Sequence, residues 1–229
     1  MSLFSSSKNL TLNEVKKIVY KIIFFGPQAS GKGTQADFLS KELNLPNISV
    51  GNLFRNNIKN QTEIGKIAQS YINDGNLVPP KFVNEMTISR LKEPDCKNGF
   101  ILDGYPRNVE QFEAFEKFTK ITHAIEIWIS DEEAIKRLGG RRSCVCGEVY
   151  HIKYKPPKVD GICDKCGGKL SIRDDDTPEA IKVRLKIYHE ETEPVIKIYQ
   201  EAGVLIKIDG EKSIEDVSKE VAKEIWLSF

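Results

Sequence analysis

The chain has 229 residues, of which 40% are hydrophobic and 29% are charged, and its formal net charge is +1 at pH 7. This balance gives no bulk attraction to nucleic acid or to a membrane surface, so we expect neither as a partner. No apolar run approaches the roughly 20 residues that a membrane-spanning helix needs. Residues 1–17 contain Glu14, no arginine and no apolar segment of the signal-peptide type. We therefore expect a frayed or loosely docked N-terminal extension on a cytoplasmic protein.

A strand followed by a glycine-rich loop opens the predicted fold. The apolar run of residues 18–25 indicates a buried strand, and residues 26–34 then read GPQASGKGT before a helical pattern over residues 34–42. Glycines in such a loop let successive backbone N–H groups converge on one point, and the following helix adds its positive N-terminal end. Lys32 can reach the outer phosphates of a nucleotide. The loop therefore predicts a nucleotide-binding site, and the alternative is an ordinary glycine-rich turn.

The remaining apolar runs alternate with helical patterns. Strands are expected over residues 100–103, 123–130 and 204–209, and a last helix over residues 212–226. Strands rich in Ile, Val and Phe that alternate with helices are typical of a parallel sheet covered on both faces, a three-layer α/β fold. Ligands bind such folds beyond the carboxyl ends of the strands.

Two stretches interrupt this alternation. Residues 49–78 carry short helical patterns and no core strand, and residues 141–176 are dense in Cys, Gly, Pro and Asp. We expect both stretches to be lobes inserted into the α/β core.

The second of these stretches carries four of the five cysteines, in two close pairs that are each followed by glycine. The pairs are Cys144 with Cys146 and Cys163 with Cys166. Four thiolates in this arrangement suit a fully ligated, structural Zn²⁺ that joins two turns. The first pair is one residue shorter than the usual C-x-x-C, so its backbone has to adapt. Disulfides are an alternative, disfavoured by the lack of a secretory signal, and four incidental thiols are another.

An acidic residue, Asp103, ends the apolar run over residues 100–103. An aspartate at the end of a strand beside a phosphate-binding loop can hold Mg²⁺ directly or through water, because Mg²⁺ prefers oxygen ligands and keeps several waters. The alternative role is that of a turn or helix cap. Arg107 follows shortly after and can project from the same sheet edge toward a phosphate.

Arginine is scarce in this chain, with eight arginines among 34 basic residues. A planar guanidinium binds phosphate oxygens in pairs, which the point charge of lysine cannot do. Single charged residues are usually solvated on the surface, so it is placement within a motif that marks an arginine as functional.

Taken together, these motifs resemble those of the adenylate kinase family, in the long form whose lid carries zinc. The segments that carry the resemblance are, in chain order, GPQASGKGTQ, ISVGNLFR, DGNLVP, GFILDGYPRN, GGRRSCVCGEVYH, PPKVDGICDKCGGKL, RDDD and KVRLKIYH. The resemblance implies a P-loop kinase fold with a five-stranded parallel sheet and a monomeric enzyme. It also implies the reversible, Mg²⁺-dependent reaction of ATP with AMP that gives two ADP.

The resemblance further implies a division of the chain into parts. The core would comprise residues 18–48, 79–139 and 177–229, with a nucleoside-monophosphate (NMP) lobe over residues 49–78 and a zinc-binding lid over residues 140–176.

Individual residues receive implied roles in the same way. Donor ATP is placed on Ala29, Ser30, Gly31, Lys32, Gly33, Thr34, Arg137, Arg141, Val149, Tyr150 and Lys212. AMP is placed on Val50, Arg55, Asn76, Leu77, Val78, Gly104, Tyr105, Pro106, Arg107, Gln111, Arg173 and Arg184. The residues implied to act in the transfer itself are Lys32, Arg107, Arg141, Arg173 and Arg184. Asp175 and Asp176 would form an acidic pair in the lid, and Arg90 and Arg142 receive no role.

This sequence departs from the family pattern at a few positions. Ala29 stands where the phosphate loop usually has glycine, so its φ must be negative or strained. Val50 and Asn52 replace a threonine and an aspartate near the monophosphate, and Pro80 replaces an acidic residue, which leaves acceptor selectivity open. Two alternatives therefore remain. One is a related kinase with GTP as donor or another monophosphate as acceptor, and the other is a nucleotide-binding or zinc-ribbon protein without turnover.

Overall fold

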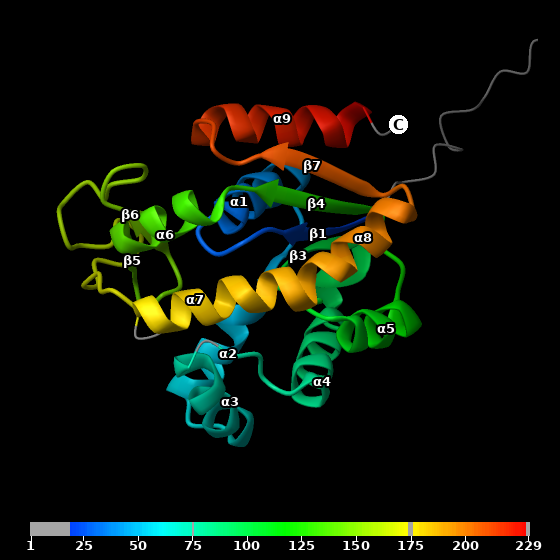
Figure 1. The fold of residues 1–229 in the computed structure, drawn as a ribbon, viewed down its shortest axis with the longest axis horizontal. Helices are drawn as coiled ribbons and strands as arrows, with labels where there is room; N and C mark the ends of the chain where they lie inside the picture. Colours follow the sequence, from blue (N-terminus) through cyan, green and yellow to red (C-terminus); the bar gives the residue numbers. More distant parts are fainter. Residues whose placement is uncertain (1–18, 75, 174–175, 228–229) are drawn as a thin grey trace, which may run out of the picture.

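The computed structural model describes residues 19–74, 76–173 and 176–227. In this part of the chain, parallel strands form a five-stranded sheet in the order β2-β3-β1-β4-β7 (Figure 1). These strands are β1 (Tyr20–Phe25), β2 (Asn47–Ser49), β3 (Gly99–Asp103), β4 (His123–Trp128) and β7 (Leu205–Asp209). The predicted five-stranded parallel sheet is thus confirmed. The N-terminal extension predicted over residues 1–17 lies outside the described residues.

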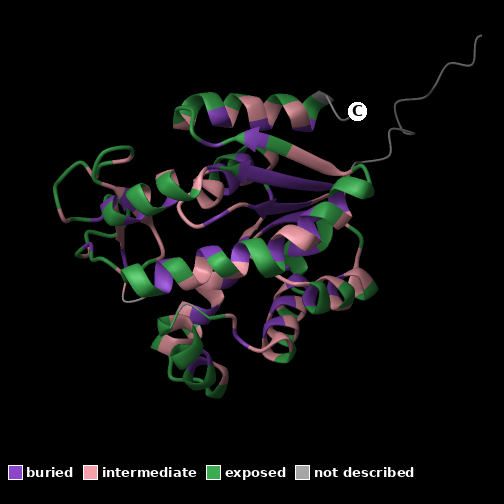
Figure 2. Cartoon of the chain, viewed as in Figure 1, coloured by how far each residue is buried: buried purple, intermediate pink, exposed green. Residues whose placement is uncertain are grey.

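Side chains of β1 alternate between the two faces of the sheet, and helices cover both faces. Ile22 and Phe24 pack with apolar side chains of α1 (Lys32–Leu43) and α9 (Ile214–Leu227). Ile23 and Phe25 belong to the cluster on the opposite face. Because both faces of β1 are buried, its sequence is a continuous apolar run rather than an alternation of apolar and polar residues. Figure 2 shows the buried strands between helices that bury one side and expose the other.

Helices that pack on the second face include α4 (Pro80–Leu91), α5 (Val109–Phe118) and α8 (Glu193–Glu201), with a 3-10 helix over Pro94–Asn98. Two further helices, α6 (Asp131–Gly140) and α7 (Pro178–Ile187), pack in a separate apolar cluster. A π-helical turn over Tyr188–Thr192 joins α7 to α8 without a loop. Ile181 and Leu185 of α7 pack against Ala134 and Leu138 of α6.

Two small units project from this core. The first is a helix pair, α2 (Val50–Lys59) and α3 (Glu63–Asn73), which cross closely because Gly65 lies against the backbone of Asn57. The second begins with an antiparallel hairpin of β5 (Arg141–Ser143) and β6 (Val149–His151). In Figure 1 the arrowheads of β4 and β7 point toward the side on which this hairpin lies. We call residues 141–173 the cysteine lobe.

The boundaries of several elements differ from the sequence-based expectations. The short strand β2 was missed because it has three residues and a single buried one, Ile48. The strand expected over residues 123–130 ends at Trp128, since the hydroxyl of Ser130 caps α6 by accepting from the backbone N–H of Glu133. The helix expected from residue 212 begins at Ile214.

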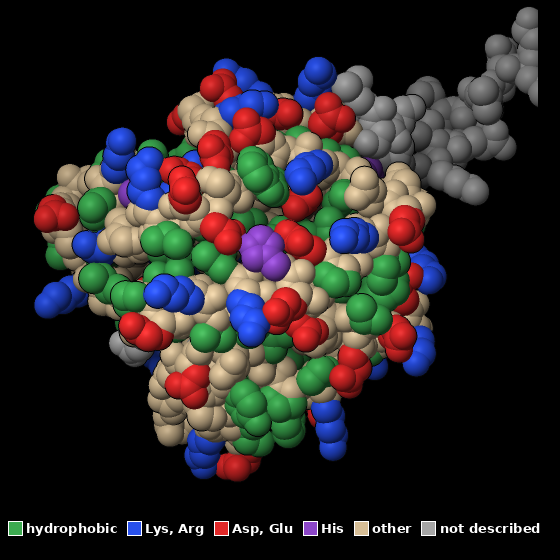
Figure 3. Space-filling view, in the orientation of Figure 1, with side chains coloured by type: hydrophobic (Ala, Val, Ile, Leu, Met, Phe, Trp, Pro, Cys, Tyr) green, Lys and Arg blue, Asp and Glu red, His purple; other side chains and the backbone are tan. Residues whose placement is uncertain are grey.

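The surface agrees with the near-neutral composition. Acidic and basic side chains are interspersed over the face drawn in Figure 3. Among the described helices, none combines the length and the apolar character that a membrane span requires.

Candidate active site

A cleft of about 690 Å³ opens at the carboxyl ends of the strands, between the sheet, the α2–α3 pair and the cysteine lobe. The two projecting units approach each other across the cleft. A Cβ atom placed on Gly147 of the cysteine lobe would lie only 3.5 Å from Nδ2 of Asn52 on α2. The described arrangement is therefore a closed one, in which a ligand would be surrounded on several sides.

The glycine-rich loop between β1 and α1 forms the floor of the cleft, and residues 28–34 all line it. Gly31 has a left-handed φ of 94° immediately before α1, which glycine adopts without a steric cost. Ala29 has a φ of 59°, so of the two outcomes expected for this alanine the strained one is found.

Lys32 begins α1 and folds back over the loop. Its Nζ donates a hydrogen bond to the carbonyl oxygen of Pro27 at 3.0 Å. Burial lowers the pKa of Lys32 to about 8, Asp103 opposes this shift, and Arg107, Arg141 and Arg184 add to it. The ammonium thus sits in a site with an excess of positive charge, which an anionic ligand would stabilise.

Six of the eight arginines line the cleft, and they are the six to which the resemblance assigned roles: Arg55, Arg107, Arg137, Arg141, Arg173 and Arg184. The other two have local partners instead. Arg90 pairs with Asp95 at 2.7 Å, and Arg142 donates to the backbone carbonyls of Gly139 and Arg141.

Burial lowers the pKa of four of these cleft arginines, Arg55, Arg107, Arg173 and Arg184. Neighbouring arginines lower it further for Arg55, Arg173 and Arg184. The lowering therefore reflects mainly the cost of burying these cations, with mutual repulsion as a smaller part for Arg55, Arg173 and Arg184. A polyanion bound among them would offset both effects by pairing with the buried charges.

The turn after β3 holds Arg107 in place from three directions. Its Nε donates to the carbonyl of Gly104 at 2.9 Å, and its backbone N–H donates to Oε1 of Gln111 at 2.8 Å. The hydroxyl of Thr192, in the π-helical turn, donates to the carbonyl of Arg107 at 2.9 Å. The bond to Gly104 orients the guanidinium, and the bonds to Gln111 and Thr192 fix the backbone of Arg107.

Asp176 joins two of the cleft arginines. Its side chain is 1% exposed and accepts from Nε of Arg141 at 2.8 Å and from the adjacent Nη2. Arg184 approaches the same carboxylate at 3.6 Å. Asp176 thus links the cysteine lobe to α7, whereas Asp175, its predicted partner in an acidic pair, lies outside the described residues.

The residues predicted to contact the two nucleotides differ in how they meet the cleft. All of those predicted for donor ATP line it. Of those predicted for AMP, eight line it: Arg55, Leu77, Gly104, Tyr105, Pro106, Arg107, Arg173 and Arg184. Val50, Val78 and Gln111 are buried outside the lining and Asn76 is exposed outside it. The roles of all these residues in nucleotide binding stay predictions.

Asp103 ends β3 and faces the phosphate-binding loop, where its Oδ2 would lie 3.7 Å from a Cβ placed on Gly33. Its Oδ1 is buried and has no hydrogen-bond partner among the described residues. A carboxylate oxygen that is buried without a donor beside a phosphate site fits a hydrated Mg²⁺ ion.

The four cysteines of the cysteine lobe come together outside the cleft lining. Their Sγ atoms all lie within 4.8 Å of one another, with Cys144 and Cys166 at 3.4 Å and Cys146 and Cys163 at 3.7 Å. Tetrahedral zinc with Zn–S bonds of about 2.3 Å places its sulfur atoms roughly 3.8 Å apart. The cluster therefore fits the four-thiolate site that the sequence predicted.

The two cysteine turns also show how the backbone adapts to the shorter first pair. In the first turn the N–H of Gly147 donates to the carbonyl of Cys144, three residues earlier. In the second turn the N–H of Gly167 donates to the carbonyl of Cys163, four residues earlier, so the first turn is one residue shorter. Gly147 and Gly167 have φ values of 92° and 71°, which explains why glycine follows each pair.

Sequence reasoning missed several polar residues of the cleft wall, among them Glu133, His151 and Tyr154. One signal was present for Glu133, since it lies four residues before Arg137 on a helical pattern, the spacing of an ion pair on one helix face. His151 and Tyr154 belong to the cysteine lobe and carry no comparable local signal.

The phosphate-binding loop, the parallel sheet and the cationic cleft define the class as a P-loop phosphotransferase that binds nucleotides. A family model described as adenylate kinase matches residues 24–204. The chain is 46% identical to the adenylate kinase of Lachnospira eligens over 89% of this chain and 98% of that protein. It is also 46% identical to those of Caldanaerobacter subterraneus subsp. tengcongensis (90% and 96% covered) and Caldicellulosiruptor saccharolyticus (90% and 99%). The chain belongs to the adenylate kinase family.

Proposed function

We propose that the cleft carries out the family's reaction with Mg²⁺-ATP as donor and AMP as acceptor, and that the residues lining it bind different phosphate groups of the two nucleotides. The chain catalyses the reversible transfer of a phosphoryl group from ATP to AMP, which gives two ADP. The observation that carries the division of roles is that Lys32 and six arginines line one cleft together with the phosphate-binding loop.

The physical task of the cleft is to bring two polyphosphates, with roughly six negative charges between them, within bonding distance. No covalent nucleophile is needed, because the acceptor oxygen belongs to AMP. We assign the donor phosphates to Lys32 and to the loop N–H groups, and the AMP phosphate to Arg55 and Arg107. The transferring group falls to Arg141, Arg173 and Arg184. These cations offset the repulsion and stabilise the charge that develops during transfer.

Asp103 is the proposed holder of the metal, through water. Mg²⁺, when bound, neutralises charge on the transferring phosphate and its neighbour. The buried, unpartnered Oδ1 of Asp103 supports this role.

We further propose that residues 140–176 act as a lid and residues 49–78 as the NMP lobe, on a core of residues 18–48, 79–139 and 177–229. Closure would exclude water, which competes with AMP as phosphoryl acceptor. The closed approach of Gly147 to Asn52 supports this division. Zinc on Cys144, Cys146, Cys163 and Cys166 would stiffen a lobe whose buried apolar cluster contains besides cysteine only Tyr150 and Leu170 among the described residues. A cytoplasmic monomer stays the prediction from composition and family resemblance.

The residue roles can be tested with two adjacent arginines. Arg141 lines the cleft and Arg142 does not, so Arg141→Met should lower kcat by at least about a hundredfold while Arg142→Met stays near wild type. Equal effects of the two substitutions would overturn the assignment.

A panel of donors and acceptors tests substrate choice. ATP and GTP would each be paired with AMP, CMP and UMP in a coupled assay of nucleoside diphosphate formation. The highest kcat/KM for ATP with AMP is expected. Preference for GTP or for another monophosphate would favour the related kinase, and absence of turnover with every pair would favour the non-enzymatic alternative.

A further inference from the structure

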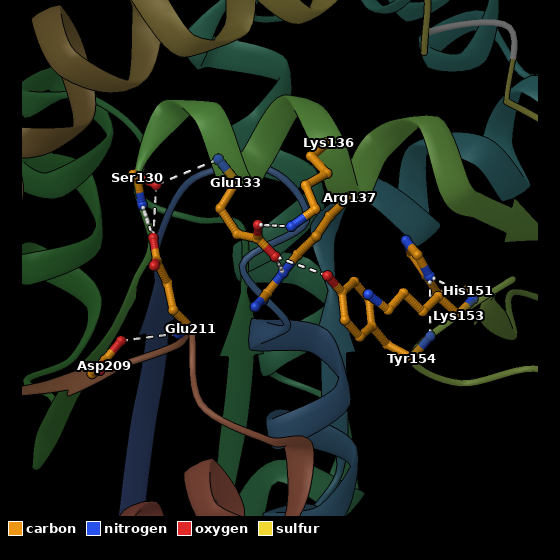
Figure 4. Close-up of polar contacts among 9 residues, drawn as sticks. All are labelled: Ser130, Glu133, Lys136, Arg137, His151, Lys153, Tyr154, Asp209 and Glu211. Carbon is orange, nitrogen blue, oxygen red and sulfur yellow. Dashed lines mark hydrogen bonds and ion pairs between the residues drawn. The ribbon is translucent and has the colours of Figure 1, made fainter.

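Glu133 lies on α6, one turn before Arg137, on the wall of the cleft (Figure 4). Its carboxylate accepts three side-chain hydrogen bonds. Oε1 accepts from Nε of Arg137 at 2.8 Å and from the hydroxyl of Tyr154 at 3.1 Å, and Oε2 accepts from Nζ of Lys136 at 2.9 Å. Neither Glu133 nor Tyr154 belongs to the residues that were assigned a role above.

The hydrogen bond between Tyr154 and Glu133 joins two parts of the molecule that the proposed lid closure brings together. Tyr154 belongs to the cysteine lobe and Glu133 to a core helix. The side chains of Glu133 and Arg137 are 16% and 12% exposed, so the shared carboxylate is largely removed from water. A hydroxyl that donates to an ionised carboxylate is a stronger contact than a neutral pair.

We propose that Glu133 and Tyr154 form a donor-side latch. The hydroxyl of Tyr154 on the carboxylate of Glu133 holds the cysteine lobe closed over bound ATP, while the same carboxylate fixes the guanidinium of Arg137 beside the donor base. This inference rests on the proposed function of the cleft, and it makes Glu133 and Tyr154 positioning residues.

The contacts around Arg137 show how its guanidinium is oriented. Glu133 accepts a hydrogen bond from its Nε, and the ring of Tyr154 covers one face of the guanidinium, with the ring centroid 5.3 Å from Cζ. A guanidinium has two faces, so the opposite face remains for stacking with a flat ligand such as a nucleobase.

Tyr154 is itself held within the cysteine lobe. The backbone N–H groups of Lys153 and Tyr154 both donate to Nδ1 of His151, at 3.0 and 3.2 Å. The rings of His151 and Tyr154 have centroids 4.6 Å apart. The Tyr154 hydroxyl is therefore presented to Glu133 by a locally ordered turn rather than by a free side chain.

The N-terminal cap of α6, just before Glu133, also contacts the donor side of the cleft. Oε1 of Glu211 accepts from the backbone N–H and the hydroxyl of Ser130, at 2.9 and 2.7 Å (Figure 4). Glu211 precedes Lys212, which is predicted to contact donor ATP through its backbone. One helix thus aligns the Lys212 loop at its start and the Arg137–Tyr154 pair further along. The arginines assigned to AMP, Arg55 and Arg107, are not bonded to Glu133.

A latch of this kind predicts an effect on ATP alone. Tyr154→Phe removes the hydroxyl and keeps the ring over Arg137, so it should weaken ATP binding by about three- to tenfold. Glu133→Met removes the acceptor for both Tyr154 and Arg137 and should weaken it more. Lys136→Met is the matched control, because it removes an exposed donor from the same carboxylate and leaves the other two contacts in place.

The experiment measures the Kd of ATP by calorimetry and the KM of each substrate for the wild type, the three single variants and the Tyr154→Phe/Glu133→Met double variant. The expected result is a rise in Kd and KM for ATP, an unchanged KM for AMP, and a Tyr154→Phe effect that shrinks when Glu133 is already Met. Thermal melting of each variant separates this result from a loss of folded protein.

Two outcomes would overturn the latch. One is an ATP affinity for Tyr154→Phe equal to that of the wild type, and the other is an equal rise in KM for AMP and ATP. Both are measured against a wild type that forms ADP. Absence of ADP formation by the wild type itself would instead refute the proposed function of the cleft, so the two failures are distinguishable.

Discussion

Ala29→Gly should stabilise this protein, although glycine usually destabilises. Ala29 occupies the phosphate-binding loop with a φ of 59°, in the left-handed region where a Cβ atom crowds the following carbonyl. An L-residue there costs about 1–2 kcal/mol relative to a residue without Cβ. Glycine removes that cost, but it also adds conformational freedom to the unfolded chain.

The magnitude follows from the balance of these two effects. The unfolded-state entropy of glycine destabilises by about 0.4–1 kcal/mol, so the midpoints of the two ranges leave a net gain of about 0.8 kcal/mol. For a protein of this size, 1 kcal/mol corresponds to about 2–4 °C in Tm. We therefore expect Ala29→Gly to raise Tm by about 1–4 °C.

The assay is thermal unfolding of the ligand-free protein by calorimetry, with Ala202→Gly as the matched control. Ala202 is the C-cap residue that follows α8; it has an ordinary φ of −75° and is exposed, so glycine there relieves no strain and should lower Tm. A Tm for Ala29→Gly at or below that of the wild type would refute the claim that the loop stores strain at Ala29.

The other predictions concern charge and metal. Lys32→Ala should reduce kcat by several orders of magnitude in steady-state assays, because its contact to the phosphates strengthens in the transition state, and near-normal turnover would contradict its role. Burial lowers the pKa of Lys32 to about 8 in the ligand-free protein, and a bound polyanion raises it, so the protonated form binds ATP more tightly. ATP affinity measured by calorimetry should therefore be full below pH 8 and fall as the pH rises above it, and equal affinities at pH 7 and pH 9.5 would argue against this. Zinc chelation or Cys163→Ser should lower Tm much more than turnover at low temperature, and an unaltered melting curve after verified metal removal would rule this out.

Much of the fold could be predicted from the sequence because its signals are local. The apolar run before Gly26, the glycines and Lys32 of the loop, and the paired cysteines are each readable within about ten residues. They specify buried strands, a phosphate-binding turn and a four-thiolate cluster. Asp103 was identified in the same way, from its place at the end of an apolar run.

What the sequence by itself determined was therefore the kind of each element and the chemistry available to it. Only the tertiary structure decided which side chains meet. Arg55 of α2, Arg141 of β5 and Arg184 of α7 line one cleft, and the hydroxyl of Tyr154 reaches Glu133, because the packing of distant elements sets these distances. The left-handed φ of Ala29 was likewise set by the loop around it. Local patterns record burial and turns, whereas the alignment of charges depends on contacts between segments far apart in the chain.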